Sequence, residues 1–121
     1  MYLKLSEEAK VTLQKYTDEH ATIILDLDDG VGTYSKMGVC SLDTSFRILI
    51  LDQAQEKKDY QKTITSDIGE VKIKDYSDMY MDEEMELSFD SRLHVFSLKS
   101  PSGVLDAHVP VVDLRTEKVR D

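Results

Sequence analysis

The chain has 121 residues and a hydrophobic fraction of 40%, which suits one domain with an ordinary core and leaves no room for a second domain. Its net charge of −9 opposes both a phosphate backbone and an anionic bilayer, so nucleic-acid binding and membrane binding are not expected. The first residues lack the apolar core of a signal peptide, and no apolar run has transmembrane length. With a single cysteine, these features predict a cytoplasmic protein without an internal disulfide.

The chain begins with a pattern that predicts a short strand followed by a helix. Tyr2–Leu5 alternates between apolar and polar residues, as a half-buried strand does. Ser6 can accept a hydrogen bond from an unpaired N–H group of the first helical turn, and acidic residues follow it where the helix dipole favours them. The apolar stripe of this helix ends near Asp18.

Two apolar runs, Thr22–Asp28 and Phe46–Leu51, predict the next pair of strands. The second run is apolar apart from Arg47, which is typical of a strand buried on both faces. The connection between the runs, Asp29–Ser45, is far longer than a usual strand connection and contains the only cysteine, Cys40. Loops of that length in a compact domain are usually functional or disordered.

The second half of the chain consists mainly of short strands. After a charged connection, the predicted strands are Tyr60–Ser66, Glu70–Lys74, Met85–Phe89, Arg92–Leu98 and Val104–Val112. One or two helical turns are expected in Asp75–Asp82, and a turn at Ser100–Gly103 joins the last two strands into a hairpin. Because strands dominate without a regular βαβ alternation, we predict a compact, mainly antiparallel β-fold with an N-terminal helix and a short second helix. It forms one domain, residues 1–113, with a charged tail at 114–121.

Two glycine-containing motifs near the long loop are interpreted as structural. Asp26-Leu27-Asp28-Asp29-Gly30 resembles the start of a calcium loop, but its glycine is fifth rather than sixth and Met37 stands where the bidentate Glu is required. Gly30-Val31-Gly32 opens a dinucleotide-type pattern that Ser35 interrupts. An acidic strand end and a flexible loop entrance explain both.

The remaining candidates for a chemical role are the histidines, the cysteine and the acidic run. His94 and His108 lie on the two arms of the predicted hairpin and could face each other, but zinc needs three or four ligands, so packing is the default interpretation. His20 is expected at the surface. Cys40 could be a buried apolar side chain, a reactive thiol or a metal ligand. The carboxylates between Asp78 and Glu86 are expected to form a solvated face.

The order of elements resembles the HesB/IscA family, the A-type iron–sulphur cluster biogenesis domain. The resemblance is carried by the phrases LKLSEEAKVTL, ILDLDDGVG…CSLDTSFRILILD and IGEVKIKDYSDMYMD, and it covers the chain from about Tyr2 to Asp113. It implies a HesB-like fold, assembly into homodimers or larger homo-oligomers, and a role in iron–sulphur cluster biogenesis.

At most part of that family's set of cysteine ligands is present in this sequence. Its carriers hold iron or a cluster with one cysteine in the glycine-containing loop and a Cys-Gly-Cys near the C-terminus, because cluster iron prefers soft sulphur ligands. No cysteine follows Cys40 in this sequence. Counting back from the Phe46 strand aligns Cys40 with the loop cysteine, whereas counting forward from Leu27 aligns Val31 or Thr33 with it.

We therefore predict a divergent HesB/IscA-like protein that has lost cluster ligation, has no catalytic residues and no cofactor, and acts through protein partners, among them iron–sulphur assembly components. Cys40 is the one candidate ligand should iron or a cluster bind after all. The alternative is a metal-free acidic interaction module unrelated to iron–sulphur chemistry, which selects basic partners. A third hypothesis, a thiol-dependent enzyme using Cys40, has less support.

Overall fold

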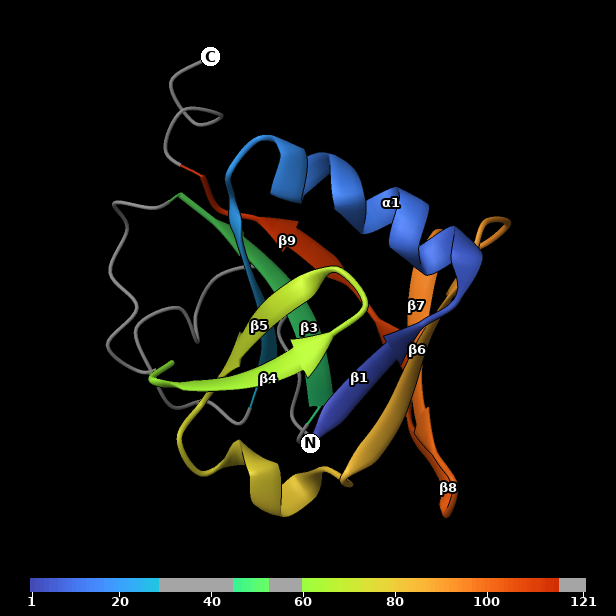
Figure 1. The fold of residues 1–121 in the computed structure, drawn as a ribbon. Coiled ribbons are helices and arrows are strands. Elements are labelled where there is room, and N and C mark those ends of the chain that lie inside the picture. Colours follow the sequence, from blue (N-terminus) through green and yellow to red (C-terminus); the bar gives the residue numbers. More distant parts are fainter. Residues whose placement is uncertain (29–44, 53–59, 116–121) are drawn as a thin grey trace.

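The computed structural model describes residues 1–28, 45–52 and 60–115. Its elements in chain order are β1 (Tyr2–Leu5), α1 (Glu7–Asp18), β2 (Thr22–Asp28), β3 (Ser45–Leu51), β4 (Lys62–Ser66), β5 (Gly69–Ile73), the single 3-10 turn η1 (Ser77–Tyr80), β6 (Glu84–Asp90), β7 (Val95–Ser100), β8 (Gly103–Val109) and β9 (Val111–Asp113). The prediction of a mainly β fold with an N-terminal helix and a short second helix is confirmed (Figure 1).

Helix α1 forms where the sequence predicts it and ends at Asp18. Ser6 has an extended backbone, and its Oγ accepts a hydrogen bond from the Ala9 N–H at 3.2 Å. Ala9 and Leu13 are buried, so the apolar stripe faces the sheet while the opposite side faces solvent. Figure 1 shows α1 lying across one end of the sheet.

Substitution of Ser6 with Ala is expected to lower the free energy of unfolding by about 1 kcal/mol, because one N–H group of the first turn loses its acceptor. Substitution with Asp restores an acceptor and is expected to preserve the stability. Urea unfolding followed by circular dichroism measures both variants. Ser91→Ala, at an exposed turn, serves as the control. Equal effects of Ser6→Ala and Ser91→Ala would contradict the capping role.

Within the described residues, nine strands form one sheet in the order β8-β7-β6-β1-β4-β5-β2-β3-β9. The two edge strands of this order, β8 and β9, follow each other in the chain and are separated by Pro110 alone. Near this junction the Phe46 N–H donates to Asp106 Oδ2 at 2.8 Å, and the Ile48 N–H donates to the Pro110 carbonyl at 2.8 Å. The sheet therefore curls round into a nearly closed, barrel-like shape (Figure 1).

Strand β1 connects two parts of the sheet through parallel pairing, which the sequence does not reveal. It lies between β4 and β6 and pairs with both in parallel, with Tyr2 opposite Thr65 on one side and opposite Glu84 on the other. The long ladders, β2–β3, β4–β5 and β6–β7, are antiparallel as predicted. The parallel pairs β1–β4 and β1–β6 thus join the antiparallel pairs β4–β5 and β6–β7.

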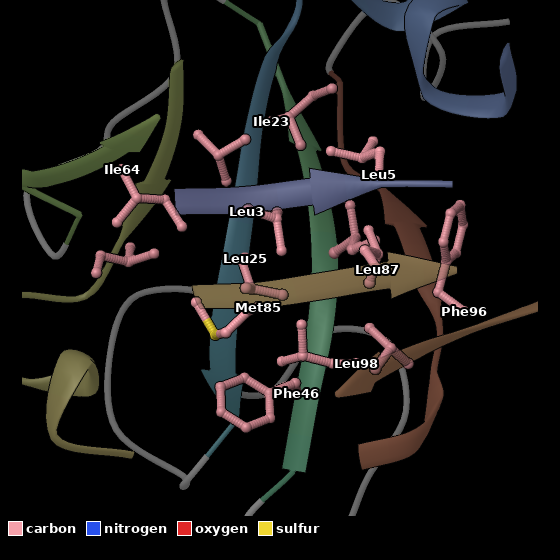
Figure 2. Packing of buried hydrophobic residues seen from close by; sticks show 14 of the residues in the cluster. Leu3, Leu5, Ile23, Leu25, Phe46, Ile64, Met85, Leu87, Phe96 and Leu98 are labelled. Carbon is pink, nitrogen blue, oxygen red and sulfur yellow. The ribbon is translucent and has the colours of Figure 1, made fainter. Parts of the chain in front are cut away.

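The main core fills the inside of the sheet. Ile23, Leu25 and Leu27 of β2 point inward, and side chains of β1, β3, β6 and β7 meet them there (Figure 2). The labelled residues of this core in Figure 2 are Leu3, Leu5, Ile23, Leu25, Phe46, Ile64, Met85, Leu87, Phe96 and Leu98. The alternation along β1, β2, β3 and β6 places every second residue in this core, as the pattern of period two requires.

The other face of β2 and β3 is also buried. Ile24, Leu49, Leu51 and Tyr60 form a second apolar cluster, each at most 1% exposed. The sequence-based expectation that β3 is covered on both faces is confirmed, because all of its residues from Phe46 to Leu51 are buried.

The last hairpin differs in its bounds from the prediction. The residues Arg92–His94 form a turn, and β7 starts only at Val95. The predicted arm Val104–Val112 is divided at Pro110, which has no N–H group to continue a ladder. The chain uses this break to leave β7 and pair with β3 through β9.

None of the helices in the described part of the chain has the length and apolar character needed to cross a membrane.

Candidate functional site

The long loop predicted to carry the functional residues starts and ends at neighbouring strands. The last residue of β2, Asp28, is paired in register with Ser45, the first residue of β3. Cys40 and its alternatives Val31 and Thr33 lie outside the described residues. The strand pair β2–β3, from which this loop leaves, is therefore the candidate site.

A buried charge cluster lies on that strand pair, on the face opposite the main core. Asp26 of β2 is directly opposite Arg47 of β3 in the ladder, and Arg47 Nε donates to Asp26 Oδ2 at 2.7 Å. Lys74, immediately after β5, places its Nζ 3.5 Å from Asp26 Oδ1. All three side chains are at most 2% exposed. We call Asp26, Arg47 and Lys74 the charge cluster.

Burial is the main influence on the carboxyl group at the centre of the charge cluster. Desolvation raises the pKa of Asp26 above its ordinary value, while the hydrogen bond from Arg47, the charges of Lys74 and Arg47, and a hydrogen bond with Tyr60 oppose this shift. A carboxylate out of contact with water requires such partners, because an isolated buried charge is strongly unfavourable. The geometry therefore indicates a structural ion cluster.

Lys74 also holds the polypeptide at the start of the long loop. Its Nζ donates to the Leu27 carbonyl at 2.7 Å, one residue before the end of β2. The Lys74 carbonyl in turn accepts from Ser77 Oγ at 2.9 Å, at the start of η1. The charge cluster thus connects the loop entrance on β2 with the segment that follows β5.

The three histidines singled out in the sequence lie on turns or at the surface of the described structure. His94 has a φ of 57° in the turn before β7, and its ring centroid lies 6.3 Å from that of Phe89 in an edge-on arrangement. His108 is exposed on β8, and its backbone N–H donates to Asp106. His20 is exposed, as expected. Across residues 1–28, 45–52 and 60–115, no three His, Cys, Asp or Glu side chains are placed to hold a metal ion.

At the C-terminal end of the described residues, Arg115 forms ion pairs with Asp113 and Glu19. Arg115 is 7% exposed, donates to Asp113 through two nitrogens at 2.8 and 2.9 Å, and donates to Glu19 Oε1 at 2.5 Å. These hydrogen bonds raise the pKa of Arg115 further above its ordinary value. The start of the predicted tail is therefore fixed to the end of α1, and residues 116–121 lie outside the description.

This donor set does not fit an iron–sulphur cluster held in the family's manner. Cluster iron is ligated by soft thiolates, usually four of them. The 121 residues contain one cysteine, which lies outside the described residues, and the polar groups at the C-terminal end are hard oxygen and nitrogen atoms already paired with each other.

Sequence reasoning missed the charge cluster, although a signal existed. Arg47 is the only charged residue in the apolar run of β3, and Asp26 lies inside the apolar run of β2. Opposite charges inside two buried strands are compatible with a cross-strand pair, but the register that places Asp26 opposite Arg47 comes from the structure. In the Asp26-Leu27-Asp28-Asp29-Gly30 motif, Asp26 is buried against Arg47 and Lys74, while Asp29 and Gly30 lie outside the described residues.

Three comparisons place the chain among known proteins. A family model described as iron–sulphur cluster biosynthesis matches residues 1–113. A search of curated proteins found no match. The crystal structure of a protein from Lactobacillus salivarius, named for Fe-S biosynthesis and described as having a novel fold, is 40% identical with a TM-score of 0.87, and the match covers 95% of this chain and 99% of that one.

A second crystal structure, of a protein from Lactobacillus acidophilus also named for Fe-S biosynthesis, is 25% identical with a TM-score of 0.66; the match covers 92% of this chain and 88% of that one. The family model spans nearly all of the sequence, and the chain superposes on both structures over most of their length. The chain therefore belongs to the iron–sulphur cluster biosynthesis family.

Proposed function

We propose that this protein is a divergent member of the family that no longer carries a cluster on its own thiolates and instead acts through protein partners, among them components of iron–sulphur assembly. It works in the cytoplasm, as a homodimer or larger homo-oligomer, and it is not an enzyme. The observation that carries the proposal is the cysteine count of one in 121 residues.

The number of sulphur donors is the decisive quantity. One subunit supplies one thiolate, Cys40, and a symmetric dimer supplies two, which is half of the usual set of four. At the end of the described residues, Asp113, Arg115 and Glu19 are bound to each other and offer no sulphur donor. The fold of the family is therefore retained while its soft ligands are reduced to one position.

Anaerobic reconstitution with iron and sulphide tests this proposal. We expect a colourless protein without charge-transfer bands in the visible spectrum, and iron and sulphide contents far below stoichiometric after desalting. A stable, stoichiometric brown protein would overturn the proposed loss of cluster ligation. In that event Cys40→Ser shows whether this thiol is the anchor. Lys4→Ser, on the surface of β1, is the matched control, because it should leave any colour unchanged.

A further inference from the structure

A group of exposed apolar side chains surrounds the 3-10 turn η1. Met79 is 81% exposed, Tyr80 54% and Tyr76 38%. Figure 1 shows η1 as the yellow turn between β5 and β6, at the end of the molecule away from α1. Single exposed apolar residues are normal on a protein surface, whereas three large ones within five consecutive positions indicate a contact surface. We call Tyr76, Met79 and Tyr80 the η1 patch.

The η1 patch is held firmly from beneath. Ser77 is fully buried and its Oγ donates to the Lys74 carbonyl at 2.9 Å. Asp78 Oδ2 accepts from Lys62 Nζ of β4 at 2.6 Å. On the other side of the turn, Met81 belongs to the main core. A surface fixed in this way loses little conformational entropy when a partner binds, which favours binding.

Negative charge flanks the η1 patch. The segment from Asp75 to Glu84 contains five acidic residues and no Lys or Arg, and of these Asp78 pairs with Lys62 of β4. Asp75, Glu83 and Glu84 are exposed. Glu83 pairs with the N-terminal amine at 3.2 Å, but its side chain is still 85% exposed. A partner with positive charge therefore meets complementary potential here, and a negative partner is repelled.

We propose that the η1 patch is the docking surface for a basic segment of another protein that also presents apolar side chains. Tyr and Met are enriched in the apolar centres of protein interfaces, where a few such side chains supply most of the binding energy. The surrounding carboxylates select the basic partner and speed the encounter. This inference deepens the proposed function, since it names the chemistry of a partner and the surface that receives it.

A second copy of the chain fits the η1 patch less well as an occupant. Docking patch to patch across a two-fold axis would bring the two acidic segments face to face.

A groove of about 450 Å³ offers a different surface, but it carries no proposal. It is lined by Lys4, Glu84, Glu86 and Lys99, among others, so its charges balance and do not favour one class of partner.

The test uses a fluorescently labelled synthetic helix-forming peptide of Leu and Lys, with a Leu and Glu peptide as its charge-reversed counterpart. Anisotropy titration at low salt is expected to show binding of the Lys peptide only. Met79→Ser/Tyr80→Ser leaves the net charge unchanged and is expected to weaken binding about tenfold or more. Leu93→Ser is the matched control, because Leu93 is 62% exposed on a different turn, beside Arg92, and its loss should leave the affinity unchanged.

The outcomes separate the possibilities. Equal binding by wild type and Met79→Ser/Tyr80→Ser, with both unfolding at the same urea concentration, would overturn the proposal, as would equal losses in Leu93→Ser. A wild-type dimer that becomes monomeric in Met79→Ser/Tyr80→Ser would also overturn it, because the occupant is then a second copy. Peptide binding does not depend on cluster loading, so a brown reconstituted protein would refute the proposed loss of ligation and leave this test intact.

Discussion

Replacing Arg47 with Met is expected to lower the free energy of unfolding by about 3–5 kcal/mol, because it leaves Asp26 buried with one of its two cations removed. Arg47 Nε and Asp26 Oδ2 are 2.7 Å apart, and neither side chain is more than 2% exposed. Water therefore cannot take the place of the guanidinium. Lys74 remains, but at 3.5 Å it compensates the carboxylate less well. Urea unfolding at neutral pH measures the loss.

The destabilisation by Arg47→Met should depend on pH in a defined direction. Burial raises the pKa of Asp26, and the variant loses the hydrogen bond from Arg47 that opposes this shift, so the pKa rises further. A carboxyl group whose pKa is higher in the folded than in the unfolded state destabilises the folded protein as the pH rises through that pKa. The difference between variant and wild type is therefore largest at neutral pH and decreases as the pH falls and Asp26 takes up a proton.

Three further variants complete this experiment, namely Asp26→Asn, Asp26→Asn/Arg47→Met and Arg92→Met. In Asp26→Asn/Arg47→Met the uncompensated carboxylate is gone, so the double variant is expected to be more stable than the sum of the two single losses predicts. Arg92→Met, at a site 89% exposed, should stay within about 0.5 kcal/mol of wild type. Additive losses, or a pH-independent difference, would contradict the assigned role of the charge cluster.

Leu98→Ala is expected to destabilise the protein by about 2–5 kcal/mol, through lost apolar burial and the cavity that remains. Leu98 is fully buried in the main core, opposite Leu87 in the β6–β7 ladder (Figure 2). Leu93→Ala makes the same chemical change at a side chain that is 62% exposed and should cost little. Urea unfolding of both variants measures the difference. Similar midpoints for the two would contradict the placement of Leu98 in the main core.

Local patterns predicted most of the elements but not how they are arranged. The alternation in Tyr2–Leu5 shows which residues face the core, and Ser6 shows where α1 begins. Alternation does not show which strands are neighbours, because a period of two defines faces and not partners. The position of β1 between β4 and β6 depends on residues more than sixty positions away, so it emerges only from the structure.

Prediction of the charge cluster requires the register of β2 against β3, which the sequence does not define. A short turn would have fixed the pairing of β2 with β3, but these strands are joined by a long connection, so the opposition of Asp26 and Arg47 could not be read directly. Arg115 was missed for another reason. It lies in a charged segment that looks like a solvated tail, and only the fold brings Glu19 within 2.5 Å of its guanidinium.

Pro110 is the only residue between the strands at the two margins of the sheet, which has a consequence for how the protein is made. On the ribosome β3 is complete long before Val111–Asp113 emerges to pair with it. β1, made first, likewise waits for β6. Val111–Asp113 must therefore be synthesised before the fold can close, and a nascent chain stalled before Val111 presents an unprotected strand edge on which other chains can aggregate.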